Sequence, residues 1–112
     1  MRVALIIASR NNAQFLIQSI DSAIHQTKPY NEIIVVDDAS EDNSLRIAEG
    51  KAAQNASVKV VALNKRMGVA RARDIGIRAS NATHISTLDA DDFLLSPRKN
   101  ELESQIIEEA AY

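Results

Sequence analysis

Three carboxylates lie within four positions of the segment STLDADDF, residues 86–93. Like charges packed this closely repel one another and resist burial, so a bound cation would explain their spacing. Side chains two positions apart in an extended segment point the same way, so Asp89 and Asp91 can converge on one ligand. Mg²⁺ and Mn²⁺ prefer carboxylate oxygens, and two carboxylates leave coordination positions for phosphate oxygens. The alternative is a solvated turn whose Asp side chains cap the following segment.

A second acidic pair follows an apolar run in IIVVDDAS, residues 33–40. Asp37 is the first polar residue after this run, where its carboxylate could hydrogen-bond a nucleobase or a ribose. Asp38 and Ser40 are typical of a turn and of the N-terminus of a following helix. A capping role is therefore favoured for Asp38 and Ser40, and the role of Asp37 stays open on spacing alone.

A third group is basic, in GVARARDIGI at residues 68–77, where Arg71 and Arg73 fall in the first turns of a predicted helix. That end of a helix favours anions, and the planar guanidinium suits phosphate or carboxylate. Arg71 can instead pair with Asp74, three positions on, at a solvated surface. A surface role is favoured for Arg71 and Arg78, whereas Arg73 is the candidate for ligand binding.

Four β-branched apolar runs predict strands that would position these groups, and a segment with helical spacing follows each run. The first two runs are apolar almost throughout, as expected of strands covered on both faces. The strands are predicted at residues 2–8, 32–38, 58–64 and 84–89.

Capping residues indicate where the helices begin. The predicted starts are the pair Asn11 and Gln14, then Asp42, then Met67 for a helix reaching about Ser80, and finally Ser96-Pro97. The predicted inner faces are Leu16, Ile20 and Ala23 in the first helix, Leu45, Ala48 and Ala52 in the second, Val69, Ala72, Gly76 and Ala79 in the third, and Leu102, Ile106 and Ala110 in the last.

The alternation of strands and helices predicts an α/β fold, a Rossmann-like three-layer α/β/α domain with a four-stranded parallel sheet. The order 3-2-1-4 would bring the ends of strands one, two and four to one crevice. Such sheets bind ligands outside the carboxyl ends of their strands, where strand order reverses. Three strands carry polar groups at that end: Ser9-Arg10-Asn11, Asp37-Asp38 and Asp89-Ala90-Asp91.

Length and composition restrict the class of protein. The 112 residues suffice for one domain, which we assign to residues 1–112. A net charge of −2 gives no support for nucleic-acid binding, which would want a basic excess. The absence of cysteine excludes disulfides and thiolate metal sites. The N-terminal apolar run is too short for a transmembrane segment and lacks a signal-peptide layout, so a cytoplasmic protein is expected.

Taken together and in this order, four motifs resemble the nucleotide-binding half of a family 2 glycosyltransferase with the GT-A fold. They are VALIIASRNN, IIVVDDAS, GVARARDIGI and LDADD, and they span nearly the whole chain. In that family the first two strand ends hold the nucleoside of a UDP-sugar, and the acidic DXD motif holds ribose and a divalent metal. The resemblance therefore implies metal-assisted binding of a nucleoside diphosphate sugar, and glycosyl transfer to an unknown acceptor.

The resemblance also implies roles for individual residues at the nucleotide. Ala8, Ser9 and Arg10 would border the nucleotide, and Asp37 would bind the base. Arg73 would lie near the base or the diphosphate. The chain departs from the family at Ala8 and Arg10, where Pro and an aromatic residue are frequent.

The acidic motif would supply the rest of the site. Asp89 would face the ribose, and Asp91 together with Asp89 would bind Mn²⁺ or Mg²⁺. Family members continue well beyond this motif, so the chain is expected to be truncated relative to them. The acceptor site and the general base are expected to be missing, since Asp92 and Glu101 are only weak candidates for that base, and we expect the isolated chain to transfer sugar poorly or not at all.

Other functions predict different sequences. The main alternative is a non-catalytic nucleotide-sugar or metal-binding module that acts through self-assembly. A receiver-type signalling domain would need an acidic pair after the first strand, where this chain reads ASRN, and a sugar nucleotidyltransferase would need a glycine-rich loop there. The strand at residues 84–89 is expected to leave its outer edge unpaired, which predicts a homodimer through this edge or through the last helix.

Overall fold

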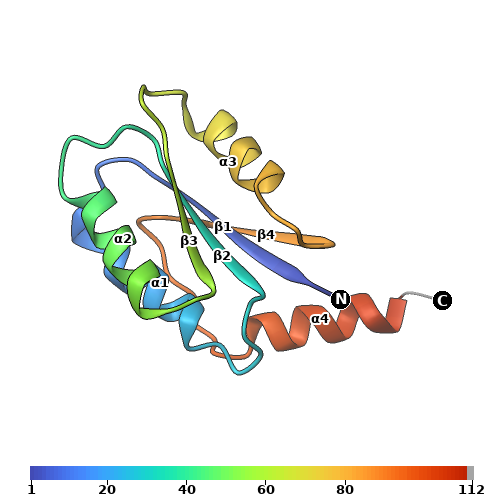
Figure 1. Ribbon diagram of the computed structural model, residues 1–112. Coiled ribbons are helices and arrows are strands. Elements are labelled where there is room, and N and C mark those ends of the chain that lie inside the picture. Colours follow the sequence, from blue (N-terminus) through green and yellow to red (C-terminus); the bar gives the residue numbers. More distant parts are fainter. Residues whose placement is uncertain (111–112) are drawn as a thin grey trace.

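The computed structural model describes residues 1–110, which form an open sheet with helices packed against it (Figure 1). Each predicted strand is present, and a helix follows each one. In chain order the elements are β1 (Val3–Ser9), α1 (Ala13–Ile24), β2 (Glu32–Asp37), α2 (Ser44–Gln54), β3 (Val58–Ala62), α3 (Val69–Arg78), β4 (His84–Asp89) and α4 (Lys99–Ala110).

The four strands are parallel and lie in the order β3-β2-β1-β4, which confirms the predicted topology. β1 and β2 are therefore the central strands, and their side chains are buried almost throughout. This burial explains why both strands read as uninterrupted apolar runs. The register aligns Ser9 with Asp37 and Ala8 with Asp89, so the polar carboxyl ends of three strands meet at one edge of the sheet.

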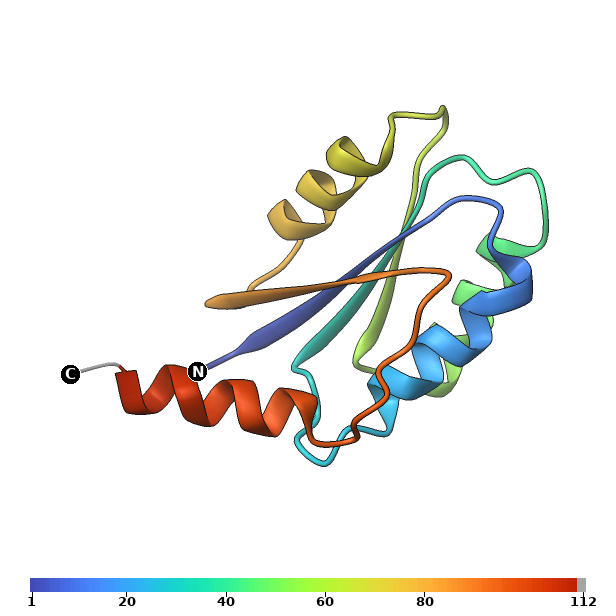
Figure 2. The same ribbon diagram turned by 180° about the vertical axis from the view of Figure 1, so that it is seen from behind.

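Helices cover both faces of the sheet, which makes three layers. Figures 1 and 2 show α1 and α2 on one face and α3 on the other. The residues of β1 alternate between two cores, because successive strand side chains point to opposite faces. Leu5 and Ile7 pack with Leu16 and Ile20 of α1, whereas Ile6 packs with Ala72 of α3 on the other face.

A glycine lets α3 lie close to the sheet. A Cβ atom at Gly76 would lie 2.7 Å from Cγ2 of Ile6 and 2.9 Å from Cγ2 of Val36, closer than carbon atoms pack. The predicted inner face is confirmed for Ala72 and Gly76. It is wrong for Val69 and Ala79, which are exposed because the helix contacts the sheet only along its middle turns.

The predicted capping of the first helix by Asn11 and Gln14 is wrong. Asn11 adopts a φ of 54°, and its Oδ1 accepts a hydrogen bond from the Glu41 N–H at 2.8 Å. A free backbone N–H at the start of α1 finds its acceptor in the loop between β2 and α2 instead. The Ala13 N–H donates to Oδ2 of Asp42 at 3.1 Å. Asp42 also accepts a bond from the Ser44 N–H at 2.9 Å, as predicted for the start of α2.

The predicted inner face of the last helix is also wrong. Leu102 is 41% exposed and Ile106 is 66% exposed, whereas Asn100 and Ser104 are buried. Polar contacts position α4, since the Asn100 N–H donates to Oε1 of Gln26 and the Asn100 Nδ2 donates to the carbonyl of Lys28. The side chain of Ala110 lies outside the described residues. Within the described part of the chain, no helix is both long and apolar enough to cross a membrane.

Candidate functional site

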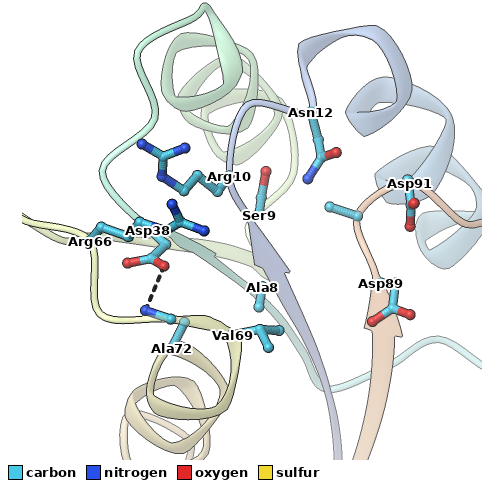
Figure 3. A pocket seen from close by; sticks show the side chains of 12 residues that line it. Ala8, Ser9, Arg10, Asn12, Asp38, Arg66, Val69, Ala72, Asp89 and Asp91 are labelled. Carbon is cyan, nitrogen blue, oxygen red and sulfur yellow. Dashed lines mark hydrogen bonds between the residues drawn. The ribbon is translucent and has the colours of Figure 1, made fainter.

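A pocket of about 380 Å³ opens at the carboxyl ends of the strands, where the sequence predicted a site (Figure 3). It lies between the end of β1, the N-terminus of α3 and the end of β4. The lining residues are Ala8, Ser9, Arg10, Asn12, Asp38, Arg66, Gly68, Val69, Ala72, Asp89, Ala90 and Asp91. We call it the carboxyl-end pocket. Five of the seven predicted site residues line it, and Asp37 and Arg73 do not.

Hydrogen bonds between crossovers hold the β1 end of the pocket. The Asp38 N–H donates to the carbonyl of Ser9 at 2.8 Å, and the Asn11 N–H donates to Oγ of Ser40 at 3.0 Å. The Ser9 hydroxyl is buried and has no hydrogen-bond partner among the described residues. An unpaired buried hydroxyl that borders a pocket is available to a ligand or to water.

The two carboxylates at the end of β2 face different surroundings. Asp38 lines the carboxyl-end pocket and holds the start of α3, since its oxygens accept bonds from the Met67 N–H at 2.7 Å and the Gly68 N–H at 2.9 Å. Sequence reasoning missed this position because it assigned Asp38 to the following helix. Asp37 is 2% exposed, and its Oδ2 accepts a bond from the Ser40 N–H at 3.1 Å. Its Oδ1 is unpaired within residues 1–110.

Opposite charges line opposite sides of the pocket. Figure 3 shows Arg10 and Arg66 on the side of Asp38, and Asp89 and Asp91 across from them at the end of β4. Arg66 was not among the predicted site residues, although it lies two positions before Gly68 in the loop that leads to α3. The arrangement suits a ligand with an anionic part, because guanidinium groups attract it and a bridging cation could join it to the carboxylates.

Two serines of α1 anchor the acidic turn after β4. The Ser19 hydroxyl donates to the carbonyl of Ala90 at 2.7 Å and also contacts the carbonyl of Asp92. The Leu94 N–H donates to Oγ of Ser22 at 3.0 Å. This anchoring holds backbone groups of the turn, and the side chains of Asp89 and Asp91 line the pocket. The spacing of two serines on the inner side of a helix is the sequence signal that could have predicted it.

An ion pair connects α3 to the end of β4. Nη2 of Arg73 contacts Oδ1 of Asp89, and both side chains are partly exposed. The predicted ion pair between Arg71 and Asp74 is wrong. Asp74 pairs instead with Arg78, whose Nε lies 2.9 Å from Oδ2 of Asp74. Arg73 and Asp89 border a second cavity of about 730 Å³, which lies between β4 and α4 and which we call the β4–α4 cavity.

One acidic group near the site has a shifted pKa. The hydrogen bond with the Ser44 side chain lowers the pKa of Asp42, burial opposes this, and bonds from the Ser44 and Ala13 N–H groups lower it further. Asp42 thus stays ionised as it joins the starts of α1 and α2 behind the pocket. This charge therefore belongs to the scaffold of the site.

The donor set of the pocket fits a cation that is only partly held by protein. Asp89 and Asp91 both line the pocket, and within the described residues no three acidic or histidine side chains form a cluster. Two carboxylates leave most positions of an octahedral shell to water and ligand oxygens, which is how Mg²⁺ is usually bound beside phosphates. The residues therefore fit a divalent ion that arrives with a phosphate ligand.

The three layers and the strand order, together with the solved structures that this chain resembles, define the fold as the Rossmann-like α/β fold of the GT-A type. S. aureus TarS in complex with UDP superposes with a TM-score of 0.87 at 24% identity, over 97% of this chain and 32% of that one. The mannosyltransferase PcManGT from Pyrobaculum calidifontis, in complex with GDP-Man and Mn²⁺, gives a TM-score of 0.79 at 25% identity. This match covers 86% of this chain and 29% of that one.

The family follows from the sequence comparison. The model of glycosyl transferase family 2 matches residues 4–111, so the chain belongs to that family. It is 36% identical over 94 residues to the uncharacterized glycosyltransferase EpsJ of Bacillus subtilis, covering 84% of this chain and 27% of that protein. It is 28% identical over 109 residues to the glycosyltransferase GlyG of Streptococcus pneumoniae, covering 97% and 36%. The chain thus spans about a third of the length of these relatives.

Proposed function

We propose that this chain is the donor-binding part of a glycosyltransferase and that it binds a nucleoside diphosphate sugar, specifically a UDP-sugar, together with Mn²⁺ or Mg²⁺. The observation that carries the proposal is the carboxyl-end pocket, where two arginines face two carboxylates across the ends of β1 and β4. A diphosphate bridged to the carboxylates by a divalent ion would balance both sides of this pocket.

The nucleoside would lie against the ends of β1 and β2. Ala8, Ser9 and Arg10 border this part of the pocket, and the unpaired Ser9 hydroxyl is available for a hydrogen bond. Asp38 offers a carboxylate at the pocket wall, and we propose it as the acceptor for a base N–H. The same role was expected for Asp37 from the sequence. We propose instead that Asp37 supports the site indirectly, by accepting the hydrogen bond from the Ser40 N–H that holds the turn after β2.

The diphosphate would lie towards the end of β4. Asp89 would face the ribose, and Asp91 together with Asp89 would hold the divalent ion. Such an ion, when bound, stabilises the negative charge that builds on the diphosphate leaving group. Arg10 and Arg66 would orient the donor with charge-assisted hydrogen bonds. Because the chain spans a third of its relatives, the acceptor site is proposed to lie in other parts of such enzymes.

The relatives support a donor of this chemical class. One structural neighbour was solved with UDP and with UDP-GlcNAc, and another with GDP-Man and Mn²⁺. These neighbours carry different nucleotides, and Mn²⁺ is described for one of them, so the experiment must test the nucleotide and the metal separately.

Calorimetric titration of the chain with UDP, GDP and TDP, each with Mn²⁺ and with EDTA, tests the proposal. We expect UDP to bind more tightly than GDP or TDP, and Mn²⁺ to increase the affinity for UDP. Binding of none of the three nucleotides would overturn the proposal. A transfer and hydrolysis assay with UDP-sugars separates an enzyme from a non-catalytic binding module, because only an enzyme releases UDP.

We further propose that the chain forms a homodimer. The outer edge of β4 pairs with no strand within the described residues, and apolar side chains lie exposed beside it. Edge strands with free backbone groups readily pair with a second chain. A two-fold arrangement would cover this edge or the neighbouring face of α4.

A further inference from the structure

The ion pair between Arg73 and Asp89 indicates that the two residues have different roles in the proposed donor site. Arg73 lies directly after Ala72, whose side chain is fully buried against the sheet, and three positions before Gly76. The close packing of α3 at these two residues brings the guanidinium of Arg73 to the end of β4. There its Nη2 donates a hydrogen bond to Oδ1 of Asp89.

The two residues share one cavity, but only Asp89 also borders the carboxyl-end pocket. Asp89 lines both the carboxyl-end pocket and the β4–α4 cavity, whereas Arg73 lines only the β4–α4 cavity. Arg73 therefore reaches Asp89 from outside the carboxyl-end pocket. Its contact occupies Oδ1 and leaves Oδ2 of Asp89 without a bond from this arginine.

We propose that Arg73 is a positioning residue: it orients the Asp89 carboxylate for the divalent ion and does not itself contact the nucleotide. The inference rests on the proposed function and revises the role that the family resemblance gave to Arg73. A carboxylate that is 62% exposed has several accessible rotamers, and a fixed donor selects one of them.

Known effects of residues that hydrogen-bond to metal ligands give the expected loss of metal affinity when Arg73 is replaced. Groups that hydrogen-bond a ligating side chain orient it, and their removal costs about 10- to 100-fold in metal affinity. Loss of Arg73 should therefore weaken the metal-dependent part of donor binding. It should affect binding of the nucleotide without metal much less, since Arg73 does not line the pocket that would hold the nucleotide and acts there only through the contact of Asp89 with the ribose.

The test compares Arg73→Gln, Arg73→Lys and Arg71→Gln with the unaltered chain. UDP affinity is measured by calorimetry with Mn²⁺ and with EDTA, and Mn²⁺ affinity in the presence of UDP is measured by electron paramagnetic resonance. We expect Arg73→Gln to weaken Mn²⁺ binding at least about tenfold and to leave UDP binding in EDTA within about twofold. Arg73→Lys, which retains a donor of the same charge, should recover part of the loss. Arg71→Gln, at an exposed position of the same helix, should change neither value.

A double variant identifies the route of the effect. If Arg73 acts through Asp89, then Arg73→Gln combined with Asp89→Asn binds Mn²⁺ no more weakly than Asp89→Asn alone. Three outcomes would each overturn the inference and leave the proposed function standing. They are additive losses of Mn²⁺ affinity in the double variant, unchanged Mn²⁺ affinity in Arg73→Gln, and a loss of UDP affinity in Arg73→Gln that is equal in EDTA and in Mn²⁺. Absence of UDP binding by the unaltered chain under both conditions would overturn the proposed function and the inference with it.

Discussion

Asp91 and Asp92 are neighbouring carboxylates with different surroundings, which makes them a matched pair for a test of the proposed metal site. Asp91 lines the carboxyl-end pocket, whereas Asp92 lines the β4–α4 cavity and its Oδ1 accepts a bond from the Phe93 N–H at 2.9 Å. Both substitutions to Ala remove one negative charge from the same turn. A difference between them therefore reports the place of the carboxylate, not the change in net charge.

We predict that Asp91→Ala weakens UDP binding in Mn²⁺ at least about tenfold, because a direct ligand should matter no less than a group behind one. Asp92→Ala should bind UDP as the unaltered chain does. The melting temperature of Asp91→Ala should stay the same or rise, since carboxylate repulsion is relieved. Calorimetry and thermal unfolding check both parts, and equal UDP affinity in Asp91→Ala and the unaltered chain would contradict the metal assignment.

The end of β2 provides a second prediction at the residue scale. Asp38→Asn should weaken UDP binding in EDTA as much as in Mn²⁺, because its proposed partner is the base. A hydrogen bond to a charged group contributes about 1.5–3 kcal/mol, which corresponds to a loss of about ten- to a hundredfold. Asp37→Asn should have a smaller effect, because its carboxylate does not line the pocket. A larger loss in Asp37→Asn than in Asp38→Asn would restore the role expected from the sequence.

At the scale of elements, the distance between α3 and the sheet depends on one missing side chain. Gly76→Ala would press a methyl group against Ile6 and Val36, and overpacking of this kind costs about 1–3 kcal/mol. We predict a loss of unfolding free energy in that range, measured by urea denaturation. Gly50→Ala is the control, because nothing lies within 4 Å of its Cβ position in α2. It should stabilise the chain by about 0.5–1 kcal/mol, and equal effects of the two substitutions would contradict close packing at α3.

Glu32 joins three elements at the amino-terminal side of the sheet. It is 1% exposed, its Oε1 lies 3.0 Å from Nζ of Lys59 on β3, and the Asn81 N–H before β4 donates to both of its oxygens. Burial alone would raise the pKa of this carboxyl. The hydrogen bonds from Lys59, Ser80 and Asn81 outweigh it and hold the pKa below the ordinary value of 4.5.

The sign of this pKa shift predicts how stability depends on pH. Because the pKa of Glu32 is lower in the folded chain, its contribution to stability is fully present above pH 4.5 and is lost as the pH falls through the lower folded value. Urea unfolding between pH 7 and pH 3 should show this loss in the unaltered chain and a smaller one in Glu32→Gln. An identical pH dependence in both would show that Glu32 does not carry the effect.

At the scale of the whole molecule, several of the exposed apolar side chains belong to β4 and to the segment that follows it. Ile85 on β4, together with Leu95, Leu102 and Ile106 in the segment that follows, is exposed beside the unpaired edge of the sheet. Leu102 and Ile106, which the sequence predicted to be buried, thus add to the apolar surface available to a second chain. Surfaces of this kind favour association.

We predict that the chain is dimeric in light scattering and that Ile85→Lys shifts it towards the monomer, because a charged residue on an edge strand discourages pairing. Ile77→Lys is the control, since Ile77 is exposed to a similar degree on α3, across the sheet from α1 and α2. A monomer at high concentration would contradict the proposed dimer. Dissociation by Ile77→Lys and not by Ile85→Lys would move the interface to α3.

The sequence by itself determined the strands, their parallel order and the edge at which the polar residues gather. These features depend on local patterns: uninterrupted apolar runs mark the buried strands, and alternation with helices restricts how the strands can connect. The same patterns predicted Ser9, Asp89 and Asp91 as site residues, because each stands at or just after the end of a strand, and all three line the carboxyl-end pocket. Local spacing was sufficient in these places because neighbouring residues decide the outcome.

The tertiary structure alone decided which side chains meet. Asp38 binds the start of α3 about 30 positions away, Ser19 anchors a turn about 70 positions away, and Arg73 reaches Asp89 across the space between a helix and a strand. The exposed face of α4 was decided in the same way, because buried bonds of Asn100 to the segment after α1 outweigh the burial of Leu102 and Ile106. Such contacts join segments that only packing brings together, so, apart from the two serines of α1, the spacing of residues along the chain does not predict them.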